Sequence, residues 1–146
     1  MAYAWEIVEH AHARPERVWE LLADARGWAR WARFASSSLE REGAPTADGV
    51  GALRAFGTGP FKSREEVVAF EPPTHLAYEL RRGMPIKGYR ADVTLAPDGD
   101  GTRIVWESRF EHPTIPGTGA FWQWFLRTFL TDTAKRLARE AESGGS

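Results

Sequence analysis

Residues 13–31 read ARPERVWELLADARGWARW, and this stretch predicts two short helices joined at a glycine. Pro15 stands near the first turn of a helix, where its missing N–H costs little. Gly27 is expected to end this helix as a left-handed cap. A second helix is expected over residues 28–34, where Trp28 and Trp31 would stack because they are three residues apart. The apolar residues of the first helix recur at helical spacing: Val18, Leu21, Leu22 and Ala25.

The rest of the chain alternates with the two-residue period of strands until its last part. Gly/Pro-rich turns separate the segments, and the turn PDGDG at residues 97–101 predicts a hairpin. A long helix is expected from Gly117 to Glu142, with a wide apolar arc. The expected strands are residues 3–11, 37–43, 49–56, 62–71, 75–82, 87–96 and 102–111.

This order of elements predicts an α+β fold. Strands joined by short turns pair antiparallel. A strongly bent sheet of about seven strands with the long helix lying across it is the simplest way to bury both apolar faces. We expect a single domain over residues 1–142 and a flexible tail at residues 143–146, which read SGGS.

Composition excludes several classes of function. The 146 residues carry a net charge of -1, which is not the clustered basic excess of a nucleic-acid-binding protein. The chain has no cysteine, so thiol catalysis and disulfides are excluded, and a cytoplasmic location is expected. The most apolar run, residues 120–130, is too short and too polar for stable membrane insertion. The state expected is a monomer or a homodimer.

Several motifs, in this order, resemble the START-like or helix-grip superfamily. The first is Ala13-x-Pro15-Glu16-x-Val18-Trp19-x-x-Leu22-x-Asp24, followed by Trp28-x-x-Trp31. Gly49-Val50-Gly51-Ala52-Leu53-Arg54, the hairpin segments 64–73 and 76–79, and Gly101-Thr102-Arg103-Ile104-Val105-Trp106 continue the match. The similarity is to its large bacterial branch of polyketide cyclases/dehydrases and lipid-transport proteins.

The resemblance implies a curved sheet gripping the last helix, with a deep apolar cavity between them. The ligand it implies is a small hydrophobic molecule, aromatic, polyketide-like or lipid-like, with no cofactor. Three functions remain open at this point. They are a cofactor-independent cyclase or dehydrase, a non-catalytic carrier of a lipid or metabolite, and a protein-interaction module similar to the chaperone activators of the superfamily.

Alternation along the strands assigns residues to the inner face. Tyr78, Tyr89, Trp106 and Ser108 are expected to face inward. Arg54 and Phe56 share a face on the strand after Gly49. The candidate ligand contacts are therefore Phe56, Tyr89, Trp106 and Ser108, together with Trp31, Phe70, Phe125 and Phe129. Each aromatic residue among them can equally serve the core alone.

On the strand at residues 62–71, Glu66 and Phe70 share a face with Val68, and we expect that face to be the inner one. A cross-strand pair between Arg54 and Glu66 would then satisfy two buried charges. Such a pair can be purely structural. If it is catalytic, Arg54 matches the arginine that polarises a carbonyl in similar aromatase/cyclases. Burial would make Glu66 a base, and Tyr78 or Tyr89 could pass a proton.

The histidines give no evidence for a metal site. His10-x-His12 is the only spacing that resembles a ligand pair, and neither a carboxylate nor a third histidine is evidently placed to complete it. No metal is expected. On the last helix Trp122 and Trp124 are two residues apart, so we expect one of them to be exposed.

Overall fold

The computed structural model describes residues 2–58 and 60–143, and its main feature is a curved antiparallel sheet of seven strands. Of the expected tail, residues 144–146 lie outside the described residues. The predicted α+β class is confirmed. From one edge to the other, the strands are β1 (Tyr3–Ala11), β8 (Gly101–Phe110), β7 (Arg90–Asp98), β5 (His75–Arg82), β4 (Phe61–Glu71), β3 (Leu53–Thr58) and β2 (Ser36–Arg41).

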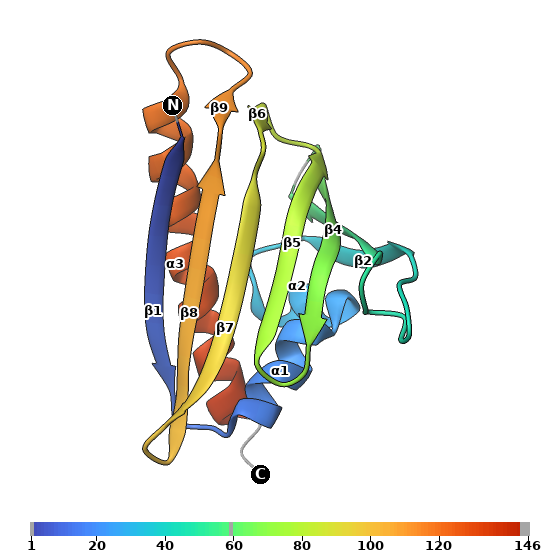
Figure 1. Ribbon diagram of the computed structural model, residues 1–146, viewed down its shortest axis with the longest axis vertical. Helices are drawn as coiled ribbons and strands as arrows, with labels where there is room; N and C mark the ends of the chain where they lie inside the picture. Colours follow the sequence, from blue (N-terminus) through green and yellow to red (C-terminus); the bar gives the residue numbers. More distant parts are fainter. Residues whose placement is uncertain (1, 59, 144–146) are drawn as a thin grey trace.

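The helices cover one face of this sheet. The long helix α3 (Gly119–Ser143) lies behind β1 and β8 in the view of Figure 1. Helices α1 (Pro15–Ala23) and α2 (Trp28–Trp31) lie at one end of the sheet, separated by a single 3₁₀ turn, η1 (Ala25–Gly27). This arrangement is the predicted helix-grip fold.

The glycine between the short helices has a different role from the predicted one. Gly27 has a φ of −84°, so it is not a left-handed cap. The space beside it is filled, because a Cβ atom at residue 27 would lie 2.6 Å from Oδ2 of Asp24, and the Asp24 side chain would have to shift. The second helix is also shorter than expected, since α2 ends at Trp31.

A second glycine interrupts the strand expected at residues 87–96. Gly88 has a φ of 74°, a left-handed conformation that breaks the pleat. The residues before it form a short strand, β6 (Ile86–Lys87), which leaves the main sheet and pairs with β9 (His112–Pro113). The chain rejoins the sheet at Arg90, so that the buried Tyr89 lies immediately before β7.

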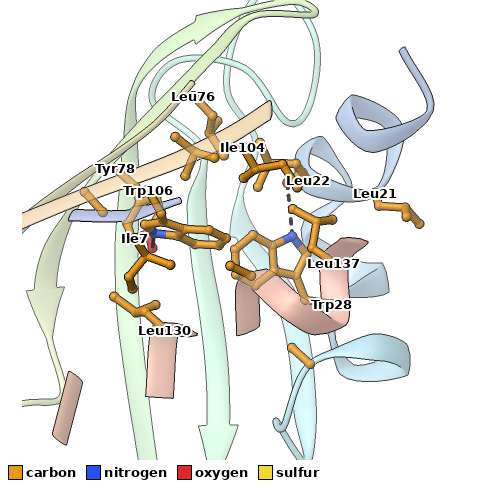
Figure 2. Packing of buried hydrophobic residues seen from close by; sticks show 14 of the residues in the cluster. Ile7, Leu21, Leu22, Trp28, Leu76, Tyr78, Ile104, Trp106, Leu130 and Leu137 are labelled. Carbon is orange, nitrogen blue, oxygen red and sulfur yellow. Dashed lines mark hydrogen bonds between the residues drawn. The ribbon is translucent and has the colours of Figure 1, made fainter. Parts of the chain in front are cut away.

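The core lies between the concave face of the sheet and the helices. The inner residues predicted for β7 and β8 are all buried, and Trp106 at the centre is fully buried. Figure 2 shows the ring of Trp106 beside that of Trp28, with Leu22 and Leu137 around them. The edge-on contact of the two indole rings, at 5.9 Å between centroids, joins the sheet to α2.

Across residues 2–58 and 60–143, no helix is both long enough and apolar enough to cross a membrane. The longest, α3, is an amphipathic helix. Its buried side faces the sheet through Leu126, Leu130, Ala134, Leu137 and Ala141.

Candidate functional site

A cavity of about 560 Å³ lies between the sheet, α2 and the first half of α3. Aromatic rings form most of its wall: Trp28, Phe34, Phe56, Trp122, Phe125 and Phe129. The few polar side chains of the lining are Ser63, Glu65, Tyr78, Tyr89 and Thr133. An apolar cavity with a small number of polar groups is the usual form of a small-molecule site.

Five of the predicted site residues line this cavity. They are Phe56, Tyr78, Tyr89, Phe125 and Phe129, which the structure brings together from β3, β5, the residue before β7 and α3. The others, Trp31, Arg54, Glu66, Phe70, Trp106 and Ser108, are not part of the described lining.

Glu66 points away from the cavity, so its expected inward orientation is wrong. Its carboxylate pairs with Arg81 at 3.0 Å and Arg41 at 3.4 Å on the outer face of the sheet. These arginines hold the pKa of Glu66 below its ordinary value. The reason is a bulge in β4 between Val67 and Ala69, which reverses the alternation along the strand.

The same bulge explains how Phe70 can be inner although Glu66 is outer. The ring of Phe70 packs edge-on against Trp19 of α1, at 5.2 Å between centroids. The residues of β4 that are buried before the bulge are Glu65 and Val67. Phe70 therefore supports α1, and Glu65 takes the inner position that had been expected for Glu66.

Glu65 is the acidic residue of the cavity. Glu65 is 8% exposed, and it lies directly opposite Arg54 in the pairing of β3 with β4. Burial raises the pKa of its carboxyl to about 7, against the opposing attraction of Arg54. Within the described part of the chain, the structure gives this carboxyl no hydrogen bond or ion pair, so it is free to contact a ligand.

Arg54 turns away from Glu65 and toward the end of α1. Its Nη2 donates to the carbonyl of Ala23 at 2.8 Å, and its Nη1 donates to the carbonyl of Leu22 at 3.3 Å. Its guanidinium also lies over the ring of Trp28, 5.7 Å from the centroid. The expected pairing of Arg54 with Glu66 is thus wrong, and Arg54 instead fixes a helix end and a wall of the cavity.

Tyr78 and Tyr89 bring two hydroxyl groups to the cavity. Trp106 Nε1 donates to the Tyr78 hydroxyl at 3.2 Å, as Figure 2 shows, and the Tyr89 hydroxyl lies 3.5 Å from Ser108 Oγ. Burial raises the pKa of both tyrosines well above the ordinary value, so both stay neutral. Trp106 and Ser108 act behind the wall, because each contacts a tyrosine that lines it.

The three tryptophans of the opening stretch have separate places. Trp19 packs in the core between α1 and β4, and Trp31 packs against Trp28 at 4.9 Å between ring centroids. Trp28 lines the cavity, whereas Trp31 lies behind it. The hydrogen bond from Trp28 Nε1 to the carbonyl of Leu22, at 3.0 Å, fixes the orientation of this wall.

Sequence reasoning missed three lining residues of consequence, Trp28, Phe34 and Glu65. Spacing on α2 could not distinguish Trp28 from Trp31, because both are buried on the same face. For Glu65 the sequence pattern gives no signal. Val67, two residues further along, is fully buried, and only the bulge lets both Val67 and Phe70 lie on the inner side.

The N-terminal half of α3 carries aromatic residues on two sides. Trp122 lines the cavity, and Trp124 is 63% exposed, as the two-residue spacing predicted. Phe121 and Phe125 stack with a centroid separation of 6.2 Å and are also exposed in part.

The sequence of this chain matches a known protein family. A sequence model described as "Polyketide cyclase / dehydrase and lipid transport" matches residues 6–142. No curated protein matches the chain.

Three solved structures share the fold at low sequence identity. A protein from Nitrosospira multiformis is 20% identical with a TM-score of 0.70, and the match covers 96% of this chain and 99% of that one. Ara h 8.0201 is 12% identical with a TM-score of 0.77, and the match covers 98% and 99%. The protein TTHA0849 from Thermus thermophilus is 19% identical with a TM-score of 0.75, and the match covers 99% and 100%.

Proposed function

The chain belongs to the polyketide cyclase / dehydrase and lipid transport family, and on that basis we propose that it binds a small hydrophobic molecule with aromatic rings in its cavity, as a cofactor-independent cyclase or dehydrase. The observation that carries the proposal is the unpaired carboxyl of Glu65 in an otherwise aromatic cavity. Burying an ionisable group without a partner is costly, and such groups gather at functional sites.

The size of the cavity supports a ligand of this kind. A volume of about 560 Å³ is within the range of small-molecule sites. Flat rings would gain stacking contacts with the aromatic lining, such as Phe34 and Phe129, in addition to apolar burial.

The polar side chains support a reaction in addition to binding. A carboxyl whose pKa lies near 7 can gain or lose a proton at neutral pH, which is what a general acid or base requires. Glu65 thus takes the proton-transfer role that had been assigned to Glu66. Tyr78, which was expected to pass a proton, can donate a hydrogen bond to a carbonyl oxygen in place of Arg54, and Arg54 supports the site by holding α1 and Trp28.

Binding of the neutral dye Nile red, followed by its fluorescence, tests the proposal. Leu126 is a buried lining residue of α3, and Leu126→Trp would place a large ring in the cavity. We expect this variant to lose the dye signal and the displacement of dye by naphthalene. The matched control is Thr128→Trp, at an exposed position of the same helix, which should bind as the wild type does.

Equal dye binding by the two variants, with thermal melting showing that both are folded, would place the dye outside the cavity and contradict the proposal. Binding that is present in the wild type and absent only from Leu126→Trp supports it.

A further inference from the structure

We propose that protonated Glu65 and the Tyr78 hydroxyl donate hydrogen bonds to one oxygen of the ligand, and that this oxygen is the oxyanion of a phenol or of an enolised ketone. The inference rests on the proposed function, because it concerns the same cavity. It names the chemical class of ligand and the two side chains that select it.

The first support is the position of the two donors. Val67 lies opposite Tyr78 in the pairing of β4 with β5, and Glu65 is two residues from Val67 on the same face. Side chains in this diagonal relation on neighbouring strands lie within reach of a common atom. Both Glu65 and Tyr78 line the cavity, so one ligand oxygen can contact the two.

The second support is the hydrogen bonding of Tyr78. Its hydroxyl accepts a bond from Trp106 Nε1, so its own proton is left for the neighbouring Tyr89 hydroxyl or for an acceptor on a ligand. A hydroxyl that accepts one hydrogen bond also becomes a stronger donor of the next. The fully buried Trp106 therefore prepares Tyr78 to donate into the cavity.

The third support is the charge behind the cavity wall. Arg54 is 1% exposed, and its contacts within hydrogen-bonding distance are neutral carbonyl groups and not a carboxylate. The carboxylates that attract this buried cation are Asp48, Glu65 and Asp24, and in the described part of the chain none of them forms a direct ion pair with it. When Glu65 is protonated its share of this attraction is lost, and an oxyanion bound at Glu65 replaces that negative charge through hydrogen bonds of the strong, charge-assisted kind.

The fourth support is that Glu65 can hold its proton there. The groups facing it are Arg54 from β3, Tyr78 from β5 and Tyr89, the residue before β7. Burial outweighs the attraction of Arg54, and an apolar site that keeps a carboxylic acid neutral turns it into a hydrogen-bond donor. Neither tyrosine ionises near neutral pH.

Two probes of the same ring size test this inference. One is 2,4-dinitro-1-naphthol, which is ionised throughout the pH range used, and the other is 1,3-dinitronaphthalene, which lacks the hydroxyl. Titration calorimetry or tryptophan quenching gives their affinities for the wild type between pH 6 and pH 8. With the Glu65 pKa at about 7, the affinity for the naphtholate should fall about tenfold over this range. The affinity for dinitronaphthalene should stay constant.

Variants assign the effect to the two donors. Glu65→Gln keeps a donor without a titrating group, so we expect its affinity for the naphtholate to match the wild type at pH 6 and to stay flat to pH 8. Tyr78→Phe should weaken the naphtholate about tenfold at pH 6 and leave dinitronaphthalene unchanged. Glu66→Gln, on the outer face of the same strand, should behave as the wild type.

The outcomes separate this inference from the proposed function. If dinitronaphthalene binds while the naphtholate does not, or if the naphtholate affinity rises with pH, the oxyanion site is wrong and the binding cavity stands. If neither probe binds to folded protein, the proposed function itself fails. A tenfold fall in the wild type that is absent from Glu65→Gln supports the oxyanion site.

Discussion

The guanidinium of Arg54 joins three parts of the molecule. It extends from β3, donates to the last carbonyls of α1 and lies over Trp28 of α2. The carbonyl groups at the end of a helix have no partner within the helix, so a buried end must find one elsewhere. The carboxylate of Asp24, which follows α1, cannot donate to these carbonyls, and Arg54 supplies the donor.

Replacing Arg54 should therefore affect stability strongly. Arg54→Met leaves the buried carbonyl of Ala23 without its partner, and we expect the free energy of unfolding to fall by about 3 kcal/mol. Urea denaturation followed by circular dichroism measures this change. Arg82→Met, at an exposed position at the end of β5, should change the free energy by less than about 0.5 kcal/mol. Equal losses in the two variants would show that Arg54 does not hold α1.

Glu65 should make the stability of the protein depend on pH. Its pKa is raised from 4.5 in an unfolded chain to about 7 in the fold, so the folded state binds the proton more tightly. Its contribution to stability is fully present below pH 4.5 and is lost as the pH rises to 7, with a total change of about 3 kcal/mol.

The difference between the wild type and Glu65→Gln isolates this contribution, because other titrating groups are common to both. We expect Glu65→Gln to gain stability relative to the wild type between pH 4.5 and pH 7, and the gain to level off above pH 7. Urea denaturation of both proteins at several pH values between 4.5 and 8 measures this difference in the free energy of unfolding. A difference that does not vary with pH would mean that Glu65 is solvated as an ordinary surface glutamate is.

At the scale of elements, strand β4 shows what a sequence pattern can and cannot predict. The existence of the strand follows from its alternation, and the inner faces of β7 and β8 follow in the same way. The bulge between Val67 and Ala69 does not follow from the pattern, because it is a shift in the register of β4 against β5, and the sequence of β4 alone does not contain that register. A bulge of one residue exchanges the two faces, which is why Glu66 was predicted at the cavity in place of Glu65.

The helices show the same division. The long helix and its buried stripe are predictable, since Leu126, Leu130 and Leu137 recur at helical spacing. The short helices are predictable as helices, but the choice of Trp28 over Trp31 as a cavity residue depends on tertiary contacts. Trp28 is fixed by its hydrogen bond to the Leu22 carbonyl of the preceding helix and by Arg54 of β3, and the spacing of the tryptophans indicates neither contact.

At the scale of the whole molecule, the cavity results from the curvature of the sheet around one end of α3. The C-terminal half of α3, around Leu137 and Ala141, packs closely against the sheet and α1. The N-terminal half leaves a cavity of about 560 Å³ between its aromatic residues and the strands. The fold class and several of the aromatic walls could be predicted from the sequence, because they depend on periodicity. The polar side of the cavity could not, because it depends on register.

A crystal structure of the protein with 2,4-dinitro-1-naphthol at pH 6 tests the central claim most directly. We expect the rings inside the cavity against its aromatic lining, and the naphtholate oxygen within hydrogen-bonding distance of both the Glu65 carboxyl and the Tyr78 hydroxyl. Rings bound only on the exposed face of α3 at Phe121 and Trp124, with the cavity empty, would contradict the account.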